Sequence, residues 1–357
     1  MILKNADLNG IIQDIITENG KISFIGKTND AGIDLKGAKV YPGLIDIHCH
    51  GSLGYDTMDG DKLEQMSMYE AENGITSWYP TTMTTPYEAI KSVTDCDIEK
   101  IKGANVLGFH LEGPYIAEKY KGAQNPDYIA KPDIKEFKSY RNAKLITLAP
   151  EVEGSLEFIK NCEAVVCIGH TDATYDEAVS AFQSGAKCLT HTFNAMPPLH
   201  HREPGVIGAA ITEGGYAQVI SDGLHIHKAA VIALYRMFTS DKMILISDTI
   251  RAAGMPDGEY ELGGQQMNVK NGVARISDGA LAGSTTNLFK CVKKAIEFGI
   301  EPDEAFKMAS LTPARLMGID DIKGKIEVGY DSDIIAVDDT YNLVLSMVGE
   351  QIYMNNL

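Results

Sequence analysis

The stretch that decides the fold runs from residue 164 to residue 202 and reads AVVCIGHTDATYDEAVSAFQSGAKCLTHTFNAMPPLHHR. Its two apolar segments predict strands, and these strands lead to His170 and His191. Residues 175–182 between them have helical spacing, and Gly185 stands where that helix would end. Strands joined by one helix and short connections run parallel. We therefore expect both histidines at the same end of neighbouring strands, where a barrel or an open α/β sheet builds a metal site.

The same alternation of strand and helix recurs from residue 44 to residue 247. Eight apolar segments predict strands: 44–48, 76–80, 106–110, 145–148, 165–169, 188–191, 217–221 and 243–247. Helical patterns follow several of them, at 62–73, 86–100, 175–184 and 228–239. Eight parallel strands with intervening helices predict an α/β fold, a (β/α)8 TIM-like barrel spanning residues 42–324. In such a barrel the chemistry lies at the carboxyl ends of the strands.

The two ends of the chain differ from the barrel. Residues 1–41 and 325–357 alternate apolar and polar residues, as β-strands do, and we expect them to pair into one small second domain. Near the end of the barrel, residues 258–273 predict an inserted hairpin. Helices are predicted from residue 284 to residue 294 and from residue 302 to residue 317.

Charge and composition exclude several classes of protein. The 357 residues carry a net charge of −17, which argues against nucleic acid and anionic membranes as partners and requires a local cationic pocket for any anionic substrate. The six cysteines form no CxxC pair and lie partly in apolar segments, which predicts reduced thiols in a cytoplasmic protein. The first ten residues are too polar for a signal peptide, and no apolar run is long enough to cross a membrane.

Polar residues gather at the predicted strand ends. His48 and His50 stand two residues apart in a strand, so their side chains point to the same face. The complete set is His48, His50, Glu112, His170, His191, Asp222, His225 and Asp248. Imidazole and carboxylate are the ligands of catalytic zinc or ferrous iron, where one position stays open for water. Because no thiolate occurs in this set, it favours a catalytic metal over a structural zinc.

Two further features suggest chemistry, and each has a simpler interpretation. Asp248 ends the last predicted strand, where a carboxylate could take a proton from an activated water and return it to a leaving amine. It could instead cap a helix. Asn194, nearby backbone amides and Arg202 could hold an anion such as phosphate. Arg202 could equally be an ordinary surface residue.

These motifs resemble the amidohydrolase superfamily and, within it, the family of N-acetylglucosamine-6-phosphate deacetylases. The matching segments span residues 42–338: PGLIDIHCHG, GFHLEGPY, KGAQNP, IGHTDAT, THTFNAMPPLHHREPG, SDGLHI, LISDT, LAGS and GKIEVGYDSDIIAVD. HLEGP and HTFNAM are specific, whereas GHTDA and SDG are weaker alone. The resemblance implies a barrel with a small β-sandwich domain that is built from both chain ends.

The resemblance also implies roles for the residues at the strand ends. Glu112, His170 and His191 match the primary metal ligands, and Asp248 matches the catalytic acid and base. An HxH pair such as His48 and His50 can hold a second metal, bridged by Glu112. The fourth strand does not end in lysine (ITLAPE), unlike hydantoinases and dihydroorotases, which bridge two metals through a carboxylated lysine. The metal could be Zn²⁺ or Fe²⁺, with one or two ions per chain.

Other positions match the family's contacts with its sugar-phosphate substrate. They are Ala123, Gln124, Asn194, Ala195, Arg202, His225, Leu281, Ala282 and Gly283. Some family members carry a histidine at the position of Gln124, where it is thought to polarise the acetyl carbonyl; glutamine donates a hydrogen bond but carries no charge. The family is typically homodimeric, and the equivalent of Arg202 can reach into the neighbour's site.

The implied activity is metal-dependent hydrolysis of a linear amide. The substrate would be N-acetylglucosamine 6-phosphate and the products glucosamine 6-phosphate and acetate, as in amino-sugar catabolism and recycling. One alternative is another amidohydrolase reaction, on a cyclic amide or an N-acyl amino acid. A second, from a different class, is a non-catalytic protein that binds a metal or a sugar phosphate.

Overall fold

The computed structural model of this chain describes residues 1–277 and 279–357, and a parallel barrel forms its centre. The barrel strands are, in chain order, β6 (Leu44–Cys49), β9 (Ile75–Thr82), β11 (Phe109–Glu112), β12 (Ala143–Leu148), β13 (Val165–Ile168), β14 (Cys188–Leu189), β15 (Tyr216–Ile220) and β16 (Met243–Ile246). Each strand pairs in parallel with its neighbour from β6 to β16. The first and last strands meet just beyond β16, where the Asp248 amide donates to the His48 carbonyl oxygen at 2.9 Å. The predicted barrel is confirmed.

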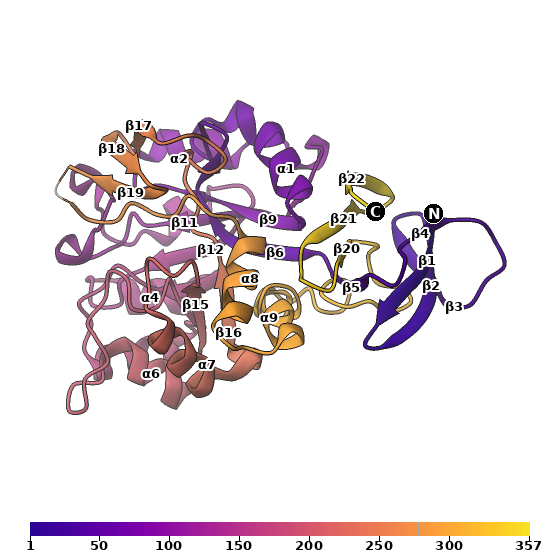
Figure 1. The fold of residues 1–357 in the computed structure, drawn as a ribbon. Coiled ribbons are helices and arrows are strands. Elements are labelled where there is room, and N and C mark those ends of the chain that lie inside the picture. Colours follow the sequence, from indigo (N-terminus) through magenta and orange to yellow (C-terminus); the bar gives the residue numbers. More distant parts are fainter. Residues whose placement is uncertain (278) are drawn as a thin grey trace.

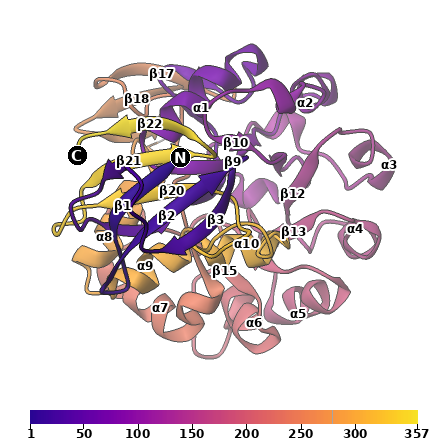
Figure 2. The same ribbon diagram turned by 90° about the vertical axis from the view of Figure 1, so that its right-hand side faces the viewer.

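Helices surround the barrel, as Figure 2 shows from the side of the small domain. They are α1 (Leu63–Glu72), α2 (Tyr87–Thr94), α3 (Ile134–Phe137), α4 (Ser155–Asn161), α5 (Tyr175–Ser184), α6 (Gly205–Glu213), α7 (Lys228–Lys242), α8 (Leu288–Glu297), α9 (Pro302–Met308) and α10 (Leu311–Met317). In α5 the Thr174 and Glu177 side chains form a capping box, and Gly185 ends the helix at φ 125°. Two parallel strands therefore flank α5, and His170 and His191 follow their ends, as predicted.

Three elements differ from the prediction for identifiable reasons. The segment predicted as one strand over 106–110 is divided into β10 (Asn105–Val106) and β11, because Gly108 between them adopts φ 141°. The helix predicted over 302–317 is two helices, since Pro313 has no N–H for the Ala309 carbonyl oxygen. That oxygen accepts instead from the Ile45 amide at 2.8 Å. The helix predicted to begin at residue 284 begins at Leu288, after Asn287 as its cap.

Both chain ends form one small sheet beside the barrel (Figure 1). Its strands run in the order β22 (Gln351–Asn355), β21 (Leu343–Val348), β20 (Ile334–Val337), β5 (Lys39–Pro42), β1 (Ile2–Leu8), β2 (Ile11–Glu18) and β3 (Lys21–Gly26), with β4 (Ile33–Asp34) against β1. Antiparallel pairing of β20 with β5 joins the two ends. The predicted small β domain is confirmed, while its boundaries at residues 41 and 325 stay a prediction.

The inserted segment lies at the opposite end of the barrel from the small sheet (Figure 1). It forms three antiparallel strands, β17 (Gly258–Leu262), β18 (Gln265–Lys270) and β19 (Val273–Ile276), where the sequence predicted a two-stranded hairpin. All six cysteines are free. Within residues 1–277 and 279–357, no helix has the length and apolar character needed to cross a bilayer.

Candidate active site

A cavity of about 450 Å³ opens at the carboxyl ends of the barrel strands. Its lining combines metal-binding residue types with polar loops and apolar side chains, among them His50, Glu112, Gln124, His170, His191, Asn194, Ala195, His225, Asp248, Leu281 and Gly283. Six of the eight residues that the sequence placed at strand ends thus line one pocket, whereas His48 is buried beneath the lining and Asp222 contacts it only through His225. Ala123 also lines it, whereas Ala282 is fully buried behind it.

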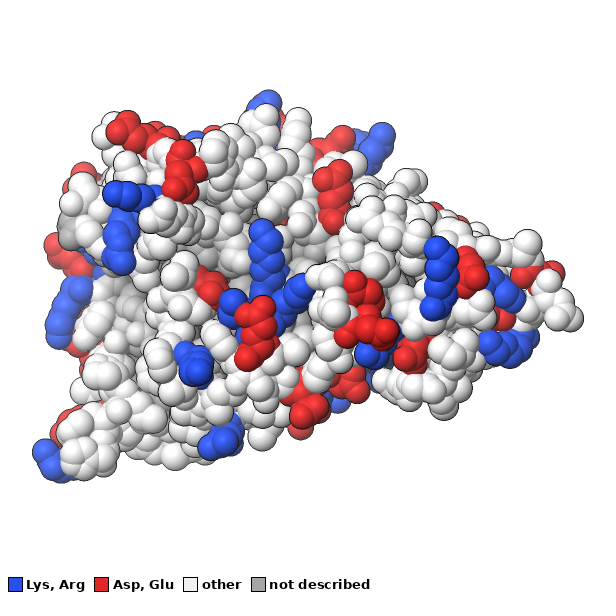
Figure 3. All heavy atoms as spheres, viewed as in Figure 1, with Lys and Arg blue, Asp and Glu red and all other residues white. Residues whose placement is uncertain are grey.

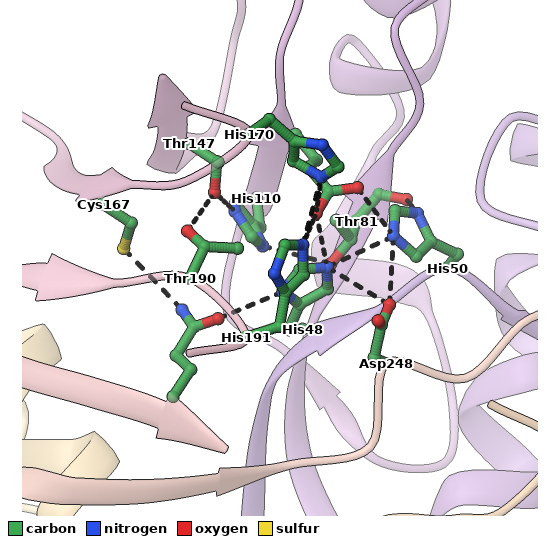
Figure 4. A network of polar contacts seen from close by, with 12 residues as sticks. His48, His50, Thr81, His110, Thr147, Cys167, His170, Thr190, His191 and Asp248 are labelled. Atoms are coloured by element: carbon green, nitrogen blue, oxygen red, sulfur yellow. Dashed lines mark hydrogen bonds and ion pairs between the residues drawn. The ribbon is translucent and has the colours of Figure 1, made fainter. Parts of the chain in front are cut away.

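The imidazoles of His48, His50, His170 and His191 converge on one point (Figure 4). The Glu112 carboxylate, at the end of β11, lies between them. Its Oε1 atom is 3.2 Å from His48 Nε2, 3.2 Å from His170 Nε2 and 3.0 Å from His191 Nε2. Its Oε2 atom is 3.2 Å from His50 Nε2. All five side chains are nearly inaccessible to solvent. One carboxylate therefore stands between two groups of histidines.

Each of the four histidines has its other ring nitrogen beside a carbonyl oxygen. The pairs are His48 Nδ1 with Gln218 Oε1 at 3.1 Å, His50 Nδ1 with the Thr81 oxygen at 3.1 Å, His170 Nδ1 with the Tyr120 oxygen at 2.8 Å, and His191 Nδ1 with the Asn194 oxygen at 3.2 Å. A carbonyl oxygen only accepts, so each Nδ1 carries a proton, and in the neutral ring the lone pair is on Nε2. This is the tautomer of a metal-ligating histidine.

The spacing of these atoms fits ligands that share an ion. Two ligands bound at about 2.1 Å around a tetrahedral ion lie about 3.4 Å apart. The Nε2 atoms of His170 and His191 are 3.1 Å apart, and those of His48 and His50 are 3.2 Å apart. Two groups of three donors result, His48 with His50 and Glu112, and Glu112 with His170 and His191. The site thus has the donors to bind a divalent metal.

The electrostatics of the cluster also favour a cation. Burial opposes charge on His48, yet Glu112 and Asp248 raise its pKa to about 10. Burial likewise opposes the Glu112 carboxylate, but His48 and His170 hold its pKa well below the usual range. The Glu112 carboxylate therefore stays ionised and draws positive charge to the point where the Nε2 atoms converge.

Asp248 lies at the rim of this cluster, just beyond β16. Its Oδ1 atom is 3.4 Å from His48 Nε2 and 3.5 Å from His50 Nε2. Its backbone has φ 48°, a strained conformation of the kind that concentrates at functional sites. The next helix, α8, begins forty residues later with its own cap, so Asp248 is not a helix cap. Its carboxylate faces the cavity next to the metal-binding groups.

Gln124 is held in one orientation beside Glu112. Its Oε1 atom accepts from the Thr84 amide at 2.7 Å, so its NH2 group must point the other way. That group donates to Glu112 Oε2 at 2.5 Å. Gln124 therefore supplies a fixed hydrogen-bond donor next to the metal-binding carboxylate.

Of the residues expected to bind the sugar phosphate, some line the cavity and one lies outside it. Asn194 and Ala195 line the cavity on the loop after β14, and His225 lines it after β15, with its Nδ1 2.7 Å from Asp222 Oδ2. Burial disfavours a charged imidazole, but Asp222 outweighs it and raises the pKa of His225. Arg202 lies outside the cavity. It is exposed on the loop that projects before α6 (Figure 1), and its guanidinium contacts His201.

Sequence reasoning missed several lining residues. Lys119 lies at the rim and pairs with Asp172 at 2.7 Å, a surface contact that no motif indicated. Three buried side chains, Met83, Ile250 and Leu262, form an apolar wall, which belongs to a cluster with the inserted strands. Ile250 stands two residues after Asp248 and could have been suspected from that spacing. Leu262 could not, because it comes from an insertion outside the barrel.

Buried imidazoles and carboxylates that converge at the carboxyl ends of barrel strands, beside an open pocket, define a metal-dependent hydrolase. The chain belongs to the amidohydrolase family, whose family model matches residues 40–351.

Similar proteins narrow the class further. The chain is 39% identical to the N-acetylglucosamine-6-phosphate deacetylase of Vibrio furnissii, over 92% of this chain and 87% of the relative. It is 38% identical to the N-acetylgalactosamine-6-phosphate deacetylase of Escherichia coli O157:H7, over 83% of each. The crystal structure of N-acetylglucosamine-6-phosphate deacetylase from Pasteurella multocida superposes with a TM-score of 0.92 at 30% identity and covers 99% of both chains.

Proposed function

We propose that this chain hydrolyses the N-acetyl group of N-acetylglucosamine 6-phosphate and releases glucosamine 6-phosphate and acetate. The observation that carries the proposal is the Asp248 carboxylate facing the pocket beside Glu112 and the four histidines. The relatives named above support the choice of an acylated amino-sugar phosphate as substrate. The reaction would serve the catabolism and recycling of amino sugars.

The metal-binding residues would be Glu112, His170 and His191, with His48 and His50 for a second ion. A divalent metal, Zn²⁺ or Fe²⁺, would supply Lewis acidity for the amide carbonyl and for the attacking water. Glu112 and the four histidines would hold the positive charge of the metal between them. Because all five side chains are buried, they also exclude bulk solvent from the metal site.

Asp248 would act twice. Its carboxylate takes a proton from the water that attacks the acetyl carbon, and then donates that proton to the departing sugar nitrogen as the C–N bond breaks. The cavity on which it borders is large enough for a sugar phosphate. The fixed NH2 group of Gln124 keeps the neighbouring Glu112 in place, so its role would be to orient this ligand rather than to carry charge.

The phosphate would be bound at the side of the pocket formed by Asn194, Ala195 and His225. Figure 3 shows acidic and basic side chains interspersed on the face in view, with no large basic surface. Because the protein as a whole is acidic, the phosphate would be bound by individual groups within the pocket. Arg202 is exposed on a projecting loop, away from its own cavity. We propose that the chain forms a homodimer in which Arg202 contacts the phosphate in the partner's site.

The sugar itself has a second candidate. Because a relative of 38% identity is named for the galactose epimer, N-acetylgalactosamine 6-phosphate is the competing substrate. An N-acyl amino acid or a cyclic amide is a weaker alternative, since neither uses a phosphate subsite. The six free thiols support a cytoplasmic location, where thiols stay reduced.

The test is a comparison of kcat/KM for four substrates: the two N-acetylhexosamine 6-phosphates, unphosphorylated N-acetylglucosamine and an N-acetyl amino acid. We expect the highest value for N-acetylglucosamine 6-phosphate. A higher value for its galactose epimer would reassign the sugar, and a preference for the amino acid would overturn the substrate class.

A further inference from the structure

The four histidines of the metal-binding cluster differ in what fixes their tautomer. For His50, His170 and His191 the acceptor is a main-chain carbonyl oxygen, which no substitution removes. For His48 it is the side-chain amide of Gln218, at 3.1 Å. Gln218 lies on β15 inside the barrel and is fully buried. Its side-chain NH2 group donates to Cys167 Sγ at 3.7 Å, which leaves the amide oxygen for His48.

We propose that Gln218 is the positioning residue that makes the second metal site functional, by holding His48 with its Nε2 lone pair toward Glu112. This inference rests on the proposed two-ion site but not on the identity of the substrate. His48 has an exposed fraction of zero, so bulk solvent does not reach its ring to take the place of the acceptor. Without it, the Nδ1 proton of His48 would be buried without a partner, and the ring would favour the tautomer that protonates Nε2.

The side-chain amide of Gln218 also affects how tightly the second metal ion is bound. A carboxylate acceptor makes a ligating histidine more basic and the metal tighter, whereas a neutral amide fixes the ring without adding charge. The Gln218 side chain makes its hydrogen bonds to His48 and Cys167, and neither of these belongs to the group of Glu112, His170 and His191. Changes at Gln218 should therefore act on one ion and spare the other.

The test is metal binding without substrate. Metal-free protein is titrated with Zn²⁺ in a chelator-buffered solution, and the ions per chain are counted. The wild type should bind two. Gln218→Met has nearly the same shape but replaces the amide oxygen by a thioether, which is only a weak acceptor. It should weaken one of the two affinities by about 10–100-fold, the usual effect of losing such a partner. Gln218→Glu keeps the acceptor oxygen and should restore or tighten that affinity.

Thr147→Val is the matched control. Thr147 is equally buried and bonds to His110 Nε2 at 2.8 Å, and His110 belongs to neither metal-binding group. Its loss should lower the melting temperature and leave both affinities unchanged. Two unchanged affinities in Gln218→Met, or a single ion in the wild type, would overturn the inference without touching the proposed deacetylation. If Gln218→Met does not fold, the affinity in Gln218→Glu decides, and a value below that of the wild type refutes the role.

Discussion

Replacing Asp248 by asparagine tests the proposed acid–base chemistry with little disturbance of the fold. Asp248 has φ 48°, a left-handed conformation that asparagine tolerates better than most other residues with a side chain. Its side chain is partly accessible at the pocket, so the variant buries no new group. We therefore expect the melting temperature to stay within a few degrees of the wild type. An alanine variant would add backbone strain and is the poorer choice.

The size of the effect follows from what the substitution removes. Asparagine keeps the shape of the side chain, but it cannot take a proton from water or return one to the leaving nitrogen. General acid–base catalysis by one positioned group contributes about 10²–10⁴-fold to the rate, which is about 2.7–5.5 kcal/mol of activation free energy. Asp248 is in neither group of three metal donors, so the number of bound ions should not change.

The assay combines kcat for N-acetylglucosamine 6-phosphate with metal analysis of the same sample. A loss of about 10²–10⁴-fold in kcat with unchanged metal content would support the role of Asp248 as base and acid. Turnover near that of the wild type would refute it. Loss of an ion in the variant would also refute it, because Asp248 would then be a ligand.

Three further outcomes are expected. Arg202→Ala should raise KM for the phosphorylated substrate by about 10–100-fold, the loss of a charge-assisted phosphate contact, and should leave unphosphorylated N-acetylglucosamine almost unaffected. A mixed dimer of one Arg202→Ala chain and one Asp248→Asn chain should regain activity if Arg202 acts across the interface, because one of its two sites then has both residues. No recovery would show that Arg202 does not act in the partner's site. Leu262→Ala enlarges the pocket at its apolar wall, so the ratio of kcat/KM for an N-butyryl substrate to kcat/KM for the N-acetyl substrate should rise about tenfold. An unchanged ratio would show that the acyl group does not contact this wall. Because Asp222 raises the pKa of His225, phosphate affinity should hold below that pKa and weaken as pH rises through it, so KM should increase. If the pH dependence of KM is the same in His225→Gln as in the wild type, His225 is not the group responsible.

The barrel was predictable because its signals are local. Each strand is a short apolar run, and its last residues are polar in a chain that otherwise alternates strand and helix. The pairing of His170 with His191 followed from one helix of ten residues between two parallel strands. Composition and periodicity also located the small domain, since both chain ends alternate in the same way.

What the sequence did not predict depends on contacts between distant segments. Pro313 is a local signal that could have indicated the helix break, but the acceptance of the Ile45 amide by the Ala309 carbonyl oxygen could not be predicted, because Ile45 is far away in the chain. The division of the third strand is a local feature instead: glycine permits the φ of 141° at Gly108, but the residue type does not dictate it. Gln218 lies in an ordinary buried strand, and nothing in its neighbours indicates that it faces His48. Periodicity gives the face of a residue but not the atom that it meets across a barrel.

The most direct test of the account is glucosamine 6-phosphate formation from N-acetylglucosamine 6-phosphate, measured before and after chelation, with metal analysis of the same sample. The account predicts that turnover is lost with the metal, returns on addition of Zn²⁺ or Fe²⁺, and requires at least one ion per chain. Turnover by metal-free protein would contradict the proposed mechanism, and its absence in fully metallated protein would contradict the proposed substrate.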